Sequence, residues 1–227
     1  MSGTVEPRHR RRAGLRLAGV IVTTLSVAAA CAEGTPDVID SLHRVRVEQC
    51  ASPENQWTTA VAVGPDTVAT VAHSLTSAEA ITAFDATGTE RSATIVYLDE
   101  AKDVAILRLA GDAGPVLPIV APASSGPVVV ASFADEDGPT RQPSEILELV
   151  DATLDGEGRR RAIKLDAEIG PGDSGAPVVN DDGEVVGMIF ATARDRRIGW
   201  AIAGTELIAA IDELGATTPE ALPPVCG

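Results

Sequence analysis

The sequence predicts an all-β protein made of two six-stranded antiparallel β-barrels followed by one C-terminal helix. Short apolar runs rich in valine, isoleucine and threonine recur along most of the chain, and turn residues separate them. The runs fall into two groups of about six, divided by "PASSGP" at 122–127. Each group suffices to close one small barrel, and 227 residues are enough to bury a core in both.

The expected strands follow in order. Those of the first group are 57–63, 67–72, 80–84, 93–98 and 104–110. Those of the second group are 127–133, 145–154, 160–166, 176–180, 184–193 and 199–203. The basic segment "GRRRA" at 158–162 is expected at a hairpin tip, with a partner contact or a self-cleavage site as the alternatives. A helix is expected over 206–214, with Thr205 as its cap and Gly215 at its end.

Residues 1–31 are of a different kind from the rest. Five arginines precede an apolar run at 17–30, which ends in small residues before Cys31. This layout is typical of a bacterial export signal. The alternative is a transmembrane anchor, but a run of 14 residues is short for a membrane span. We therefore expect an exported protein.

The end of this signal leaves two alternatives open. "VAAAC" resembles a lipoprotein box, in which Cys31 would carry lipid and attach the protein to a membrane. The small residues "AAA" also fit ordinary cleavage after Ala30, and Ala28 departs from the box, which usually has leucine at that position. The mature protein is accordingly expected outside the cytoplasmic membrane, either secreted or lipid-anchored.

The remaining chain is interpreted as a polar tether over 32–49 and a folded domain over 50–227. With Cys31 used for lipid or removed, Cys50 and Cys226 remain. An even pair of cysteines in an exported protein suggests a disulfide between them. The alternative is two free or buried thiols.

Charge excludes some partners. The net charge is −15, and five of the arginines lie in residues 1–31, so the folded part is more acidic still. Such a body is a poor nucleic-acid binder and is repelled by anionic membranes. The sequence shows neither a cysteine–histidine cluster for zinc nor a glycine-rich loop for a nucleotide. We expect no metal and no cofactor.

Three residues could together form a catalytic centre. Ser174 lies in "GPGDSGAP", and a nucleophilic serine needs a base that is itself oriented by an acid. His73 is the one histidine of the expected domain and follows an apolar strand, while Asp103 immediately precedes one. Singly, each has an ordinary reading as a core or surface histidine, a turn aspartate and a serine in a glycine-rich turn.

The motifs around these residues resemble those of chymotrypsin-like (trypsin-fold) serine proteases. "TVAHS", "DVAILRL" and "GDSGAP" are similar to that family's histidine, aspartate and serine motifs, in the same order, and the resemblance spans roughly 50–214. Residues 166–188 and 198–207 most resemble the bacterial high-temperature-requirement and glutamyl-endopeptidase branch. The resemblance implies a trypsin-like fold, a serine endopeptidase and a protein or peptide substrate. Because the chain ends soon after the helix, that branch's PDZ domain is expected to be absent.

The resemblance also implies a role for each residue. His73 would act as general base and then general acid, Asp103 would orient it, and Ser174 would attack the carbonyl carbon. The backbone N–H groups of Gly172 and Ser174 would form the oxyanion hole. Asp173 would turn inward, toward a hydrogen-bonding or cationic partner that the sequence does not identify.

Substrate contacts are implied for Glu168, Phe190, Ala191 and Thr192. Glu168 would select a basic side chain if it lined the pocket, but surface glutamates usually face solvent. Thr192 would instead narrow the entrance. Phe190 stands where a small or polar residue often lies near the aspartate, and it cannot hydrogen-bond Asp103. It supports the alternative of a catalytically weak or inactive protease-fold protein that binds peptides or a protein partner.

Overall fold

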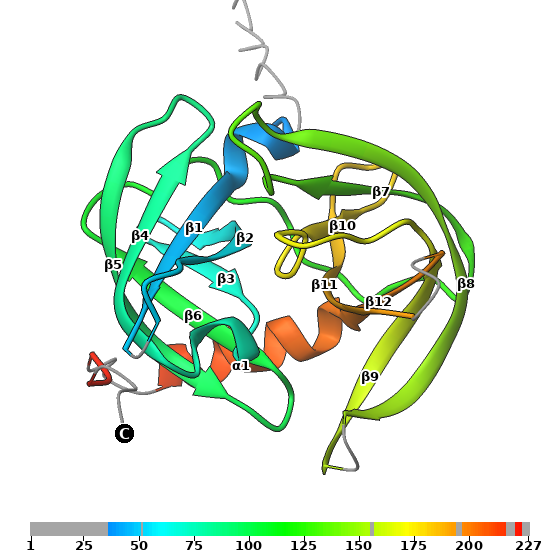
Figure 1. Cartoon of the computed structure of the whole chain (residues 1–227). Helices are drawn as coiled ribbons and strands as arrows, with labels where there is room; N and C mark the ends of the chain where they lie inside the picture. The colour runs from blue at the N-terminus through cyan, green and yellow to red at the C-terminus, as the bar shows by residue number, and fades with distance from the viewer. Residues whose placement is uncertain (1–35, 51, 155–156, 194–196, 217–220, 224–227) are drawn as a thin grey trace, which may run out of the picture. The chain divides into compact units, whose positions relative to one another are not determined.

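The computed structural model describes residues 36–50, 52–154, 157–193, 197–216 and 221–223, which contain two closed six-stranded antiparallel barrels and a helix (Figure 1). Barrel 1, in the spatial order β1-β2-β3-β6-β5-β4, comprises β1 (Leu42–Gln49), β2 (Gln56–Gly64), β3 (Thr67–Thr70), β4 (Ala78–Asp85), β5 (Glu90–Asp99) and β6 (Val104–Leu109). Barrel 2, in the order β10-β11-β12-β9-β8-β7, comprises β7 (Gly126–Ser132), β8 (Thr140–Leu154), β9 (Glu157–Asp166), β10 (Pro177–Val179), β11 (Val185–Thr192) and β12 (Ile198–Ala203). The predicted fold class is confirmed.

Helix α1 (Gly204–Ala216) follows β12, and it contains the whole segment expected to be helical. Two short 3₁₀ helices, η1 (Val38–Ser41) and η2 (His73–Leu75), flank strands of barrel 1. Each barrel has its own apolar interior, and a further buried cluster joins the barrels and receives Leu207 of α1. The helix also contacts barrel 1, because the Tyr97 hydroxyl on β5 lies 3.1 Å from a carboxylate oxygen of Glu213. The two barrels therefore form one packed unit with a border between them.

The tether expected over 32–49 is wrong for residues 38–49. Residues 42–49 form β1, the strand of barrel 1 that the sequence analysis missed. Val45 and Val47 are fully buried in the barrel interior, and the residues that alternate with them are polar or charged. Arg44 extends over the ring of Trp57, 3.7 Å from its centroid. Charged residues on one face thus concealed the two-residue period of a strand that is buried on its other face.

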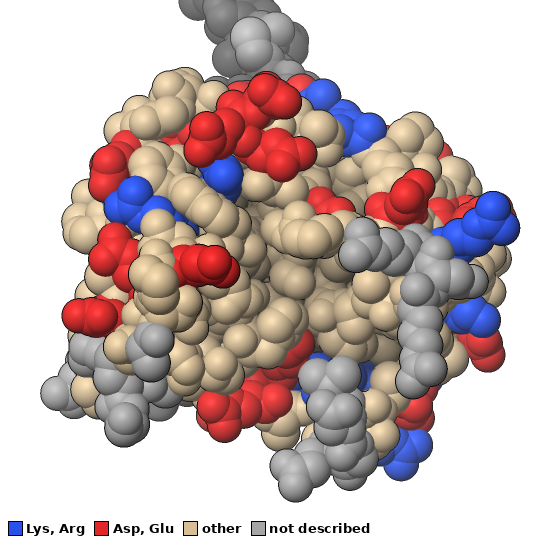
Figure 2. Space-filling view, viewed as in Figure 1, with Lys and Arg blue, Asp and Glu red and all other residues tan. Residues whose placement is uncertain are grey.

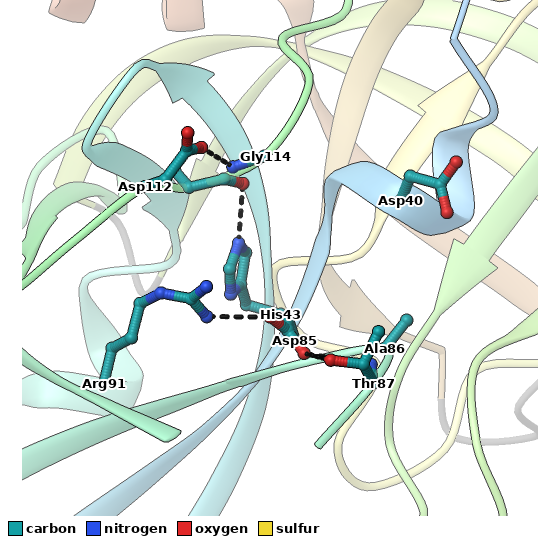
Figure 3. A pocket seen from close by; sticks show the side chains of 9 residues that line it. Asp40, His43, Asp85, Ala86, Thr87, Arg91, Asp112 and Gly114 are labelled. Carbon is teal, nitrogen blue, oxygen red and sulfur yellow. Dashed lines mark hydrogen bonds and ion pairs between the residues drawn. The ribbon is translucent and has the colours of Figure 1, made fainter. Parts of the chain in front are cut away.

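His43 lies in β1 and is buried at the edge of a cavity of about 390 Å³ (Figure 3). Its Nε2 lies 2.9 Å from the carbonyl oxygen of Ala113. Its Nδ1 is buried and has no hydrogen-bond partner among the residues described. Burial lowers the pKa of His43, because a second N–H on the ring would have no acceptor. The folded protein therefore holds the neutral imidazole.

We expect this histidine to make the protein less stable as the pH falls from 7.5 to 5.5. The unfolded chain binds the proton at the ordinary value of about 6.5, so below that pH it holds more protons than the folded state. The free energy of unfolding is then highest above the ordinary value and decreases on acidification. Replacing His43 with glutamine, whose amide can still donate to Ala113, should flatten this slope in urea denaturation. An equal slope in both proteins would contradict the assignment.

Candidate active site

His73 and Asp103 meet at the ends of adjacent strands of barrel 1. His73 begins η2 shortly after β3, Asp103 directly precedes β6, and these two strands pair in register. The Asp103 carboxylate accepts twice from His73, with Oδ1 2.8 Å from the backbone N and Oδ2 2.8 Å from Nδ1. Asp103 is buried, whereas the histidine side chain is 38% exposed. The ring is thus held by one edge and remains accessible at the other.

Asp103 adopts a backbone conformation that side chains rarely accept. Its φ is +62°, and it is the one non-glycine residue with positive φ in the described part of the chain. Such strain persists where the surroundings fix it, and it concentrates at functional sites. Here the backbone carbonyl oxygen of Asp103 lies 3.3 Å from the N of Ala72, and the Asp103 carboxylate accepts from the backbone N of His73, the residue after Ala72. The strain is therefore localised where the carboxylate is aimed at the imidazole.

Ser174 lies in a loop of barrel 2 that β2 of barrel 1 holds in place. The carbonyl oxygen of Ser174 accepts from the N of Thr59 at 2.8 Å and from Oγ1 of Thr58 at 2.6 Å. The carbonyl oxygen of Gly172 accepts from Thr59 Oγ1 at 2.9 Å. On the other side, the N of Gly175 donates to Ile189 of β11 at 2.8 Å. Both barrels therefore fix the loop that carries the candidate nucleophile.

Two donors of this loop are unused. The backbone N–H groups of Gly172 and Ser174 have no hydrogen-bond acceptor within the described ranges. The Ser174 hydroxyl also makes no hydrogen bond to the described residues. Gly172 has φ +91°, and a Cβ on it would lie 2.7 Å from that of Ala134. Unpaired N–H groups beside a serine are what an oxyanion hole requires. The serine–histidine hydrogen bond is commonly long or absent before substrate binds.

The side chain of Asp173 turns inward, and its partner there is the neutral side chain of Ser132. Its Oδ1 accepts a short hydrogen bond from Oγ of Ser132, the last residue of β7, and its Oδ2 accepts from the N of Gly170 at 2.7 Å. Ser132 was not predicted as this partner from the sequence. The only local signal for it was a polar residue at the end of an apolar strand.

Arg160 reaches the site from the β8–β9 hairpin and was also missed. Its side chain is buried, whereas those of its neighbours Arg159 and Arg161 point outward and pair with Asp151 at 2.7 and 3.5 Å. The β8–β9 hairpin is present, but "GRRRA" lies within β9, paired with residues 150–153 of β8, and not at the tip as expected; strand alternation turns its middle arginine inward. The guanidinium lies 3.8 Å from Oδ2 of Asp103. It therefore belongs to the surroundings of the candidate triad.

Of the four residues implied in substrate contact, the structure brings three together at one cavity and places the fourth elsewhere. Phe190, Ala191 and Thr192 line a cavity of about 480 Å³ together with Trp200 and residues 150–153 of β8. Glu168 is not among the residues lining this cavity, and its side chain is exposed. Figure 2 shows a hollow with few charged side chains between the barrels, surrounded by acidic groups. The structure thus supports the β11 residues as a binding edge more than it does Glu168.

Cys50 directly follows β1, and its backbone N donates to the carbonyl oxygen of Ser77 at 3.0 Å. Cys31 and Cys226 lie outside the described residues. Shortly before Cys226, Leu222 donates its backbone N–H to Ile95 of β5 at 2.8 Å, and a cavity lined by Leu222 is also lined by residues 78–81 of β4. Residues 221–223 therefore lie on the side of barrel 1 that carries Cys50. The disulfide itself stays a prediction.

The trypsin-like peptidase domain matches residues 58–188 of the chain. Serine protease Rv3671c of Mycobacterium tuberculosis strain H37Rv is 31% identical over 170 residues, which are 71% of this chain and 43% of that protein. The chain thus spans less than half the length of this curated relative. The crystal structure of the active form of Rv3671c protease has a TM-score of 0.75 at 25% identity and covers 84% of this chain and 87% of that one.

An HtrA-type protease, AlgW, solved with a tripeptide, shares the fold with a TM-score of 0.68 at 21% identity. The alignment covers 78% of this chain and 62% of that one.

Proposed function

The chain belongs to the trypsin-like peptidase family, and on that basis we propose that it is an exported serine endopeptidase. The observation that carries the proposal is the two-point hold of Asp103 on His73, at 2.8 Å to both the ring and the backbone. It fixes the tautomer with hydrogen on Nδ1, so that Nε2 is free to act as a base. The loop of Ser174, with its two unused N–H donors, supplies the rest of the chemistry.

In the proposed reaction, Ser174 Oγ attacks the peptide carbonyl carbon while His73 Nε2 takes the hydroxyl proton. The oxygen that becomes negative is stabilised by the N–H groups of Gly172 and Ser174. His73 then gives its proton to the leaving amine, and water repeats the sequence to release the acyl group. Asp103 stays ionised and stabilises the imidazolium.

We assign substrate binding to the outer part of β11. The pairing of β10 with β11 extends only to Met188, so Ala191 and Thr192 have a strand neighbour in β12 but none in β10, and Phe190 lies at the register shift between them and Ile189. An extended peptide can add to such an edge through backbone hydrogen bonds. The cavity beside Thr192 and Trp200 would receive a side chain of that peptide.

Export is proposed from residues 1–31, with lipid on Cys31 and secretion after cleavage as the two alternatives. The described part of the chain contains no helix long and apolar enough to cross a membrane. We further propose the Cys50–Cys226 disulfide, which would tie the C-terminal segment to barrel 1 and stabilise the fold by roughly 2–4 kcal/mol.

Incubating the purified protein with a peptide library should yield cleavage products detectable by mass spectrometry. The Ser174→Ala variant should produce none above background, because triad serines contribute about 10⁶-fold to kcat. Ser144→Ala, on the neighbouring β8 strand, is the matched control and should cleave normally. Peptides that bind without being cleaved by the wild-type protein would contradict the proposal and favour a peptide-binding function.

A further inference from the structure

Arg160 is a cation with almost no access to water. Its side chain is 1% exposed, and it is the largest fully buried side chain among the described residues. Removing a charged guanidinium from water is costly unless an opposite charge compensates it. One guanidinium nitrogen donates to the carbonyl oxygen of Ala101 at 2.9 Å, whereas Nε and the second terminal nitrogen have no hydrogen-bond partner among the residues described. The burial of this charge therefore needs an explanation.

The charge faces the carboxylate of Asp103. The second terminal nitrogen lies 3.8 Å from Oδ2 of Asp103, within ion-pair distance but too far for a hydrogen bond. Both oxygens of that carboxylate already accept from His73. Arg160 therefore adds positive charge to the pair without displacing the histidine. Asp103 is itself 1% exposed, so the two buried charges compensate one another.

Phe190 holds the guanidinium in this place. The central carbon of the guanidinium lies 5.1 Å from the ring centroid, within the range of a cation–π contact, which is stronger when desolvated. Phe190 occupies the position where the sequence analysis expected a small or polar residue near the aspartate. Phe190 thus contacts the cation that pairs with Asp103.

We propose that Arg160 is a positioning residue that keeps Asp103 ionised and aimed at His73, an inference that rests on the proposed function. A neutral Asp103 would hold the ring more weakly and would not stabilise the imidazolium. The same cation lies beside the pair of Asp103 and His73, so its removal is expected to change how the reaction rate depends on pH. Arg160 thereby acts on catalysis without touching substrate.

Two other charged residues close to the triad in the chain, Lys102 and Asp173, already have partners of their own. Lys102, next to Asp103 in the chain, pairs with Glu206 of α1 at 3.0 Å, and its backbone N–H is accepted by Asp99. Across the border between the barrels, the carboxylate of Asp173 is engaged with Ser132 and Gly170. Replacing Arg160 with a neutral residue should therefore remove the positive charge that lies 3.8 Å from Asp103 while leaving the triad intact.

The test is the rate at which a fluorophosphonate labels Ser174, measured from pH 5 to 9 in four proteins. Relative to wild type, Arg160→Met should react at least about tenfold more slowly at pH 7, and the midpoint of its acid limb should rise by about one pH unit. Arg160→Lys, which keeps the charge, should restore most of the rate and the midpoint. Arg159→Met, on the neighbouring exposed arginine, should match wild type.

The outcomes separate this inference from the proposed function. A folded wild-type protein that is not labelled at Ser174 would refute the proposed function. Normal labelling of wild type together with an unchanged rate and midpoint in Arg160→Met would overturn the role of Arg160 alone. If thermal unfolding shows that Arg160→Met does not fold, Phe190→Leu and Arg160→Lys decide instead. Phe190→Leu should shift the midpoint in the same direction by less, and identity with wild type would reject the proposal.

Discussion

Replacing Asp103 with asparagine should lower kcat/KM at pH 7 by about 10⁴-fold while leaving the fold intact. Both carboxylate oxygens accept from His73, one from the backbone N–H and one from Nδ1. Asparagine has the same shape but only one acceptor, so its amide nitrogen would face one of these donors. The imidazole would then turn or adopt the other tautomer, with hydrogen on Nε2, and could no longer accept the serine proton. The measurement is steady-state kinetics on any peptide that the wild-type protein cleaves.

Asp99→Asn is the matched control for this substitution. Asp99 ends β5 and accepts from the backbone N of Lys102 in the same turn, but it does not hydrogen-bond His73. Its substitution should change kcat/KM less than about threefold, as expected of a site outside the reacting groups. Equal losses of kcat/KM in both variants would show that the effect comes from disturbing the turn and not from the contact between Asp103 and His73.

Replacing Gly175 with alanine should also abolish most of the activity, by at least about 100-fold. Gly175 has φ +84°, and a Cβ on it would lie 1.9 Å from the carbonyl oxygen of Thr59 and 2.5 Å from Thr70 Oγ1. Backbone must therefore move to admit a methyl group. The carbonyl of Thr59 belongs to the strand that holds Ser174, so this movement displaces the nucleophile and its N–H donors together.

Gly88→Ala separates the clash from the strain. Gly88 has nearly the same φ, +83°, but a Cβ on it would have no neighbour within 4 Å. Both variants pay the roughly 1–2 kcal/mol of a left-handed alanine, and only Gly175→Ala adds the contact with barrel 1. Activity of Gly88→Ala close to wild type, measured with its free energy of unfolding, is the expected result. A comparable loss of activity in Gly88→Ala would mean that strain alone explains the effect.

The sequence allowed the two barrels and the candidate triad to be predicted because their signals are local. Alternating β-branched residues mark most strands, and each triad residue lies within a short motif of its own. The strand at 42–49 was not predicted because its outward-facing residues are charged, so that its two-residue alternation resembled a polar segment. The expectation from resemblance that Asp103 would meet His73 agrees with the 2.8 Å contacts between them.

The supporting residues could not be predicted because they come from distant parts of the chain. Thr59 is 115 positions before Ser174, yet its amide holds the serine carbonyl. Ser132 becomes the partner of Asp173 only when β7 closes barrel 2. The alternation within "GRRRA" could have indicated that one arginine faces inward. Nothing in the sequence indicated that Arg160 would meet Asp103 of the other barrel.

The most direct measurement of the central claim is the site of covalent modification by a fluorophosphonate. The purified protein would be labelled at pH 7.5 and digested, and the adduct located by mass spectrometry, in parallel with His73→Ala and Ser174→Ala. We predict a single adduct on Ser174 in the wild-type protein and none in either variant. An adduct on another residue, or a folded wild-type protein without one, would contradict the assignment of Ser174 as an activated nucleophile.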